Sequence, residues 1–179
     1  MQEQNSNIRI RFTKDTIKNA LAALVRTKSI SSVTVNQLCQ RAAISRTTFY
    51  RHYKDIYDVV EECEDDIIRS LQEIIIRSKN QSPEEILLIV FSNMKENPES
   101  YLPMVMIDND RINSKILHMC KKQLEESIKK KYGVSDSEKT DIILSYIIGG
   151  VNSAIAEWIK GDFALSPEEM TRITAKMLN

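Results

Sequence analysis

Apolar residues recur at three- and four-residue intervals along most of the chain, which is the spacing of one face of an α-helix. A first amphipathic helix is predicted from about Thr13 to about Thr27. A longer one is predicted from Asp55, which can cap it, to about Ser78, and neither Gly nor Pro interrupts it. Because of its length, this helix is expected to connect two domains. The pattern as a whole predicts an all-α fold.

Two short helices separated by a tight turn are predicted between these long ones. Thr34 can cap the first, and Gln37, three residues later, completes a capping box that satisfies backbone donors at the helix start. Ala43 and Ile44 form the turn, and Ser45 can cap the second helix. The stretch is therefore typical of a helix-turn-helix unit.

The second short helix is predicted to expose an unusual set of side chains. Phe49 and Tyr53 lie four residues apart and can face the core. Cationic and hydrogen-bonding side chains remain on the outer faces: Arg46, Thr47, Thr48, Tyr50, Arg51 and His52. A self-contained core does not require this cluster. We therefore predict that the helix enters the major groove of DNA.

Further helices are predicted in the C-terminal part. Ser82 and Ser166 each precede Pro-Glu-Glu, a sequence that marks a helix start. Ser135 and Glu138 are predicted to form another capping box. The predicted helices cover 82–96, 101–107, 111–131, 135–160 and 166–179, with the fourth ending at Gly161.

Charge is distributed unevenly, although the 179-residue chain is neutral overall. Residues 1–54 contain ten Lys or Arg and two acidic residues, which gives +8, and the remaining residues carry −8. A basic N-terminal third attracts a polyanion and an acidic remainder is repelled by it, so only one end is expected to bind nucleic acid. Three cysteines without a C-x-x-C pair, and an N-terminus without an apolar signal segment, favour a reduced, cytoplasmic protein.

These residues resemble a known family. The phrase SRTTFYRHY at residues 45–53, followed by Lys54, is similar to the signature of TetR-family transcriptional regulators, and the resemblance extends from Thr13 to Val60. The rest of the chain matches only in its helical content and size. Ala43 departs from the family, which commonly has Gly in this turn. If the position needs a positive φ, a non-Gly residue there costs on the order of 1 kcal/mol.

The resemblance implies roles for the residues of the helix-turn-helix unit. Thr47, Tyr50 and Arg46 are expected near base edges, and phosphate contacts are expected from Thr34, Thr48, His52 and Lys54. The full predicted DNA-binding set is Thr34, Gln37, Arg46, Thr47, Thr48, Tyr50, Arg51, His52, Tyr53 and Lys54. A homodimer would place two such helices about 34 Å apart on a near-palindromic operator.

Two more surfaces are predicted in the C-terminal domain. Gly149 and Gly150 each cost about 1 kcal/mol relative to Ala inside a helix, so close approach of another helix is expected to compensate. In the family the last two helices form a dimer interface, which here would contain Ile147, Gly149, Gly150, Val151, Ala154, Ile155 and Trp158; packing within one chain is the alternative. Met94, Tyr101, Met104, Met106 and Met119 either line an effector pocket or pack in the core.

The predicted domains are a disordered tail over 1–8, a helix-turn-helix domain over 9–54 and a regulatory and dimerisation domain over 55–179. The leading hypothesis is a ligand-responsive regulator, most often a repressor, that binds double-stranded DNA as a homodimer. The alternative is an adaptor or activator whose C-terminal domain responds to a protein partner.

Other function classes have little support in the sequence. Neither His52 nor His118 lies in a metal-binding or catalytic motif, so no enzyme activity, cofactor or metal is expected. The apolar stretch over 142–159 has the length of a membrane span, but Asn152 and Glu157 interrupt it. A buried helix is therefore favoured there.

Overall fold

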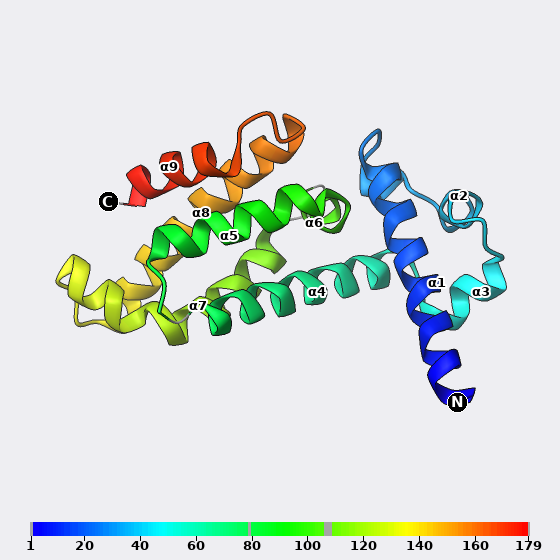
Figure 1. The fold of residues 1–179 in the computed structure, drawn as a ribbon, viewed down its shortest axis with the longest axis horizontal. Coiled ribbons are helices and arrows are strands. Elements are labelled where there is room, and N and C mark those ends of the chain that lie inside the picture. Colours follow the sequence, from blue (N-terminus) through cyan, green and yellow to red (C-terminus); the bar gives the residue numbers. More distant parts are fainter. Residues whose placement is uncertain (1, 79, 106–108, 179) are drawn as a thin grey trace. The chain divides into compact units, whose positions relative to one another are not determined.

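The computed structural model describes residues 2–78, 80–105 and 109–178 (Figure 1). Apart from one 3₁₀ turn, every regular element of these residues is an α-helix, which confirms the predicted all-α fold. The elements are α1 (Gln2–Val25), η1 (Ile30–Ser32), α2 (Val35–Arg41), α3 (Arg46–His52), α4 (Ile56–Arg77), α5 (Pro83–Glu96), α6 (Pro98–Val105), α7 (Asn109–Tyr132), α8 (Ser137–Lys160) and α9 (Pro167–Leu178).

The helices form two compact units, each made of segments that are separate in the sequence. The first, here called the head unit, contains Met1–Ile67 and Asn97–Ile107. The second, here called the body unit, contains Ile68–Glu96 and Asp108–Asn179. α4 runs without interruption from one unit into the other. By packing, therefore, the head unit is larger than the predicted domain over 9–54.

The head unit is built on the inward stripe of α1. Its buried core contains Ile17, Leu21, Val25, Leu38, Phe49, Ile56, Val59 and Val60. The last three come from α4, and this is why the first turns of that helix belong to the head unit. α6 belongs to it as well, because α6 packs against α1 and buries Tyr101 and Leu102.

Two lysines of α1 form ion pairs with two acidic residues one helical turn apart on α4. The Lys14 Nζ–Glu62 Oε2 and Lys18 Nζ–Asp66 Oδ2 distances are both 2.6 Å, and Lys18 Nζ lies 3.5 Å from Glu62 Oε1. Burial raises the pKa of Glu62, but the two lysines outweigh burial and hold that pKa below its usual value. Within the head unit, both lysines are thus neutralised.

The head unit as a whole does not carry the excess positive charge of residues 1–54. Residues 55–67 add seven acidic and no basic side chains, and α6 adds Glu99. These acids cancel the +8 of residues 1–54, so the head unit is formally neutral. An attraction for DNA must therefore come from the position of the cations that have no acidic partner, and not from the net charge of the unit.

The start of α1 differs from the prediction. The helix begins at Gln2, so the expected start near Thr13 is wrong, and the helix includes residues for which a disordered tail was expected. Residues 2–12 contain neither Gly nor Pro, and nothing in them ends a helix that has already formed. Ile8 and Phe12 are mainly exposed on this first part of α1.

Besides the last turns of α4, the body unit contains two pairs of packed helices. α7 packs against α8, and α5 packs against α9 (Figure 1). The Trp158 ring lies edge-on to Phe91 of α5 at a centroid distance of 5.6 Å, and to Phe163 at 4.8 Å. The Leu165 carbonyl accepts hydrogen bonds from Trp158 Nε1 at 3.0 Å and from Lys95 Nζ at 3.2 Å. These contacts fix the connection between α8 and α9.

Most of the predicted helix ends are confirmed. In α5, Glu85 N donates to Ser82 Oγ at 3.2 Å and Ser82 N donates to Glu85 Oε2 at 2.7 Å, and α9 begins with the same pair of bonds. The predicted cap of α8 is wrong, because Asp136 and not Ser135 is its N-cap. Asp136 Oδ1 accepts from Glu138 N at 2.8 Å. A carboxylate one residue nearer the helix therefore takes the place of the serine hydroxyl.

By length and composition, α8 could cross a membrane. Its Leu144, Ile148 and Ile155 are nevertheless buried, and the helix packs against α7. Asn152, which interrupts the apolar stretch, is buried and donates a hydrogen bond to Asn113 Oδ1 on α7. A buried amide with a partner on a neighbouring helix is typical of a core helix.

Candidate nucleic-acid interface

α2 is seated by its cap and by its apolar stripe. Gln37 N donates to Thr34 Oγ1 at 3.3 Å, and Thr34 N donates to Gln37 Oε1 at 3.2 Å, which confirms the predicted capping box. Leu38 and Cys39 are buried on the opposite side. The amide oxygen of Gln37 is thus already used by the backbone, and only its amino group remains for a ligand.

The turn between α2 and α3 contains a left-handed alanine. Ala43 has a φ of 52°, although it is not a glycine. Ile44 N donates to Cys39 O at 3.0 Å and Ala43 N donates to Gln40 O at 3.3 Å, the bond pattern of a Schellman helix end. The methyl group therefore costs on the order of 1 kcal/mol at a position where glycine is unstrained.

α3 is held between a cap and a core anchor. Ser45 Oγ accepts from Thr48 N at 3.0 Å and lies 2.9 Å from Thr48 Oγ1. Phe49 is fully buried, and the Tyr53 ring packs beside it at a centroid distance of 5.9 Å. These contacts determine which face of the helix remains outside.

The exposed face carries most of the predicted DNA-binding side chains. Thr34, Arg46, Thr47, Tyr50, Arg51 and Lys54 are exposed, and Gln37, Thr48 and His52 are partly buried. Tyr53 is a correction, because its side chain is only 3% exposed. It belongs to the core, as its spacing from Phe49 also allowed, and it is not available to a phosphate.

Four cations at this surface have no acidic partner among the described residues: Arg41, Arg46, Arg51 and Lys54. Arg41 was not in the predicted set. Its position four residues after Gln37, on the same face of α2, is the signal that would have included it. By contrast, Lys14 and Lys18 pair with α4, and Arg26 Nη2 lies 3.1 Å from Glu99 Oε1. The four unpaired cations of this surface thus lie on α2, on α3 and just after α3.

His52 adds no charge to this surface at neutral pH. Its burial lowers the pKa of the imidazole, and the nearby Lys14 and Arg51 lower it further, whereas Glu62 acts in the opposite direction. The neutral ring can donate one hydrogen bond to a phosphate oxygen, but it does not attract the phosphate by charge.

The predicted dimer residues on α8 divide between two faces. A Cβ atom placed on Gly149 or on Gly150 would meet no atom within 4 Å, so packing within the described part of the chain does not explain these glycines. Tyr146, one turn before them, is 82% exposed, and Ile142, two turns before them, is 65% exposed. Ile147, Gly149, Val151 and Ala154 are partly buried and Gly150 is exposed.

Trp158 and Ile155 do not lie on this exposed face. Trp158 is 5% exposed and Ile155 is 3% exposed. Both side chains pack in the core of the body unit. Their place in the predicted dimer interface is therefore wrong, and the alternative, packing within one chain, applies to these two residues.

The predicted effector residues are divided between the two units. Met94 is buried in α5 and Met119 is partly buried in α7, both in the body unit, whereas Tyr101 is buried against α1 in the head unit. Met106 and the side chain of Met104 lie outside the described residues.

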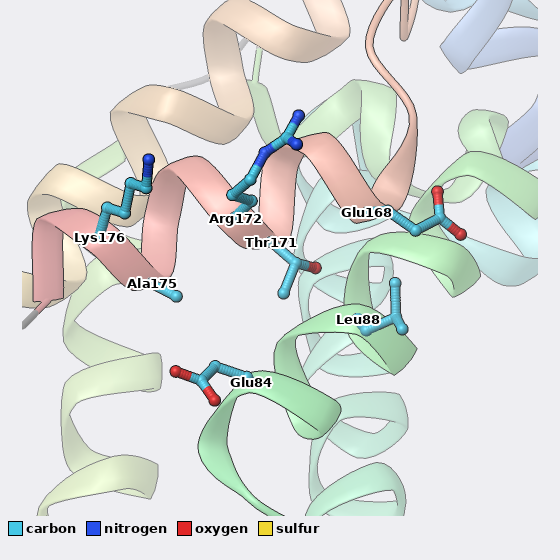
Figure 2. A pocket seen from close by; sticks show the side chains of 7 residues that line it. All are labelled: Glu84, Leu88, Glu168, Thr171, Arg172, Ala175 and Lys176. Atoms are coloured by element: carbon cyan, nitrogen blue, oxygen red, sulfur yellow. The ribbon is translucent and has the colours of Figure 1, made fainter.

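A groove that the sequence did not indicate lies between α5 and α9 (Figure 2). Its volume is about 370 Å³, and its lining residues are Glu84, Leu88, Glu168, Thr171, Arg172, Ala175 and Lys176. It is open to solvent, and four of the seven residues that line it are charged. No group of three His, Cys, Asp or Glu side chains that could hold a metal ion occurs among the described residues.

Family models match both parts of the chain. The model of bacterial regulatory proteins of the tetR family matches residues 17–63. A model of a transcriptional regulator C-terminal region within the same family matches residues 81–179. No curated protein matches the chain.

Several solved structures share the fold. A TetR transcriptional regulator from Streptococcus agalactiae 2603V is 18% identical, with 99% of both chains covered and a TM-score of 0.63. A TetR-family regulator from Syntrophomonas wolfei str. Goettingen is 14% identical, with 93% of both chains covered and a TM-score of 0.73. The fatty acid degradation regulator FadR from Bacillus halodurans is 17% identical over 93% of this chain and 94% of its own, with a TM-score of 0.69.

One family model covers the helix-turn-helix unit whose exposed face has just been described, and the other covers more than half of the chain. The chain therefore belongs to the TetR family of transcriptional regulators.

Proposed function

We propose that this regulator binds a near-palindromic operator as a homodimer in the cytoplasm, and that a small-molecule effector releases it from the DNA, so that it acts as a repressor. The observation that carries this proposal is the exposed face of α3. That face presents cations and hydroxyl groups that have no acidic partner among the described residues and that the core does not need.

The surface separates into residues that position the protein and residues that read bases. Arg46, Thr47 and Tyr50 lie on the exposed face of α3 and are suited to donor and acceptor groups in the major groove. Arg51 and Lys54 follow near the end of the helix and are suited to phosphates. Thr34, at the start of α2, adds a hydroxyl beside backbone N–H groups that can also contact a phosphate.

A second copy of the chain is the partner proposed for α8. Ile142 and Tyr146 expose apolar side chains, and Gly149 and Gly150 leave room for a close helix. Covering this face removes apolar surface from water, and it offsets the cost of two glycines inside a helix. The symmetric dimer would present two α3 helices to two half-sites.

Effector control requires a ligand that binds one dimer state more tightly than the other. α4 supports such a mechanism, because one continuous helix belongs to the cores of both units. Its ion pairs with Lys14 and Lys18 tie α1 to α4. A shift of α4 would therefore carry the helix-turn-helix unit with it.

The deciding experiment is selection of bound sites from random duplex DNA by the full-length protein. The expected result is a site with two inverted half-sites about one helical turn apart. Arg51→Ala should weaken binding to that site, whereas Lys176→Ala, which removes an exposed cation of α9, should not. Recovery of unrelated sequences without inverted symmetry would contradict the proposal.

A further inference from the structure

Arg46 lies at a position of α3 where a positive charge does not stabilise the helix. It is the first residue of the helix, after the Ser45 cap. The N-terminal end of a helix carries partial positive charge, so an arginine there is slightly unfavourable. Arg46 is exposed, and no acidic side chain of the described residues pairs with it. The folding of α3 therefore does not account for this side chain.

Tyr50, one turn further along α3, holds Arg46 in place. Arg46 Nη2 donates to the Tyr50 hydroxyl at 3.4 Å, and the guanidinium carbon lies 5.7 Å from the centre of the Tyr50 ring. Tyr50 is itself supported from below. Its ring meets Phe49 edge-on at a centroid distance of 5.4 Å, and Phe49 is fully buried. The chain of contacts thus runs from the core to the guanidinium.

The chemistry of the guanidinium indicates what it would bind. Its remaining N–H groups form a planar fork, and guanine is the base that presents two adjacent acceptors, N7 and O6, in the major groove. The first residues of a recognition helix are those that contact base edges. A side chain already held in position loses less conformational freedom on binding.

Resting on the proposed function, we propose that Arg46 reads one guanine in each half-site and that Tyr50 is a positioning residue that holds Arg46 for this contact. Thr47 and the phosphate-binding cations then act independently of that guanine. Arg46 therefore determines the preference at one base in each half-site, and other residues determine the overall affinity for DNA.

The test replaces each guanine of the selected operator by 7-deazaguanine, which lacks the N7 acceptor, and measures the Kd of the full-length protein at fixed salt. For the wild-type protein, one guanine per half-site should be sensitive, with binding weakened about 10- to 100-fold. For Arg46→Ala, the same replacement should change the Kd by less than about twofold, because the group that reads N7 is gone. Arg46→Lys should retain only part of the sensitivity, since its ammonium lacks the fork.

The role of Tyr50 is tested through the same sensitivity. Tyr50→Phe keeps the ring but not the hydroxyl, and it should retain part of the guanine discrimination, whereas Tyr50→Leu should lose most of it. In the Arg46→Ala background, Tyr50→Leu should cause no further loss of discrimination. Tyr132→Leu is the matched control, because Tyr132 is partly exposed and forms a comparable contact with Lys131, at 5.6 Å, on α7.

Three outcomes would overturn the inference. Equal 7-deazaguanine sensitivity of wild type and Arg46→Ala would show that another group reads the base. A uniform loss of affinity for all sequences in Tyr50→Leu, with discrimination intact, would assign Tyr50 to phosphate binding or to folding. A wild-type protein without sequence-selective DNA binding would end the proposed function and this inference with it, whereas selective binding without an Arg46-dependent guanine would end this inference alone.

Discussion

α3 and α8 both expose side chains that the stability of their own unit does not require, but the two surfaces differ in chemistry. α3 exposes Arg46, Thr47 and Arg51, which are cationic or form hydrogen bonds. α8 exposes Ile142 and Tyr146, followed by two glycines with open space beside them. The first surface suits a polyanion, and the second suits an apolar partner.

The comparison of the two helices shows how a binding surface can be recognised: it consists of exposed side chains that neither the caps nor the core of the unit require. Caps and the Phe49 anchor account for the inner face of α3, and packing on α7 accounts for the inner face of α8. The residues that remain on each helix share one chemical character. If the interpretation is correct, each surface can be damaged without damage to the other.

The largest effect is expected from removal of the anchor of α3. Phe49→Ala should lower the free energy of unfolding of the head unit by about 3–5 kcal/mol, because a fully buried ring is deleted. DNA binding should be lost, while sedimentation should still detect the dimer. Urea unfolding followed by circular dichroism measures the change. Phe12→Ala, which removes a ring that is 73% exposed, is the control and should change stability by less than about 0.5 kcal/mol.

Next in size is a charge placed on the apolar face of α8. Tyr146→Glu should weaken the dimer by about 2 kcal/mol or more, roughly 30-fold in its Kd, because the carboxylate would be buried against the partner. Sedimentation velocity should then show monomer at micromolar concentration, and operator affinity should fall. Tyr132→Glu on α7 should leave the dimer intact. An unchanged dimer in Tyr146→Glu would place the interface elsewhere.

A smaller and different effect is expected from a phosphate-binding cation. Lys54→Ala should weaken binding to all DNA sequences alike and reduce the slope of log K against log salt by about one unit. The measurement is a salt titration of DNA binding, with Lys176→Ala as the control. An unchanged slope would remove Lys54 from the set of phosphate contacts.

The turn before α3 should tolerate, and even gain from, the residue that the family commonly has there. Ala43→Gly should raise the free energy of unfolding by about 0.5–1 kcal/mol, because glycine adopts the φ of 52° without strain. Ala42→Gly is the matched control, since Ala42 has a φ of −78° and is buried, and it should destabilise the protein instead. A loss of stability in Ala43→Gly would mean that its methyl group contributes to packing.

The smallest effect is the pH dependence that His52 contributes. Because its pKa is lowered in the folded state, the unfolded chain takes up the proton first as the pH falls below about 6.5. The contribution of His52 is therefore fully present above that pH and is lost as the pH falls further. The free energy of unfolding of wild type should therefore fall relative to that of His52→Gln as the pH is lowered from about 7.5 to about 5.5. A difference independent of pH would contradict the lowered pKa.

Local signals in the sequence determined the elements of the interface. The hydroxyl of Thr34, the hydroxyl of Ser45 and the spacing of Phe49 act within one helical turn, so the residue order itself defines the caps and the exposed face of α3. The positive φ of Ala43 was expected only from the resemblance, because the family commonly has Gly in this turn, and an alanine by itself does not indicate it. The all-α fold and the long α4 likewise follow from periodicity.

Only the tertiary structure decided which distant segments meet. Periodicity did not show that α6 joins the head unit, that Lys14 and Lys18 are neutralised by α4, or that Trp158 packs inward. Each depends on contacts between residues far apart in the chain. An amphipathic stripe shows that a helix face is buried, but it does not show which other helix covers that face. The sequence alone therefore determined the exposed face of α3 that we propose binds DNA, whereas the fold determined which of its cations lack an acidic partner and which apolar side chains of α8 remain exposed.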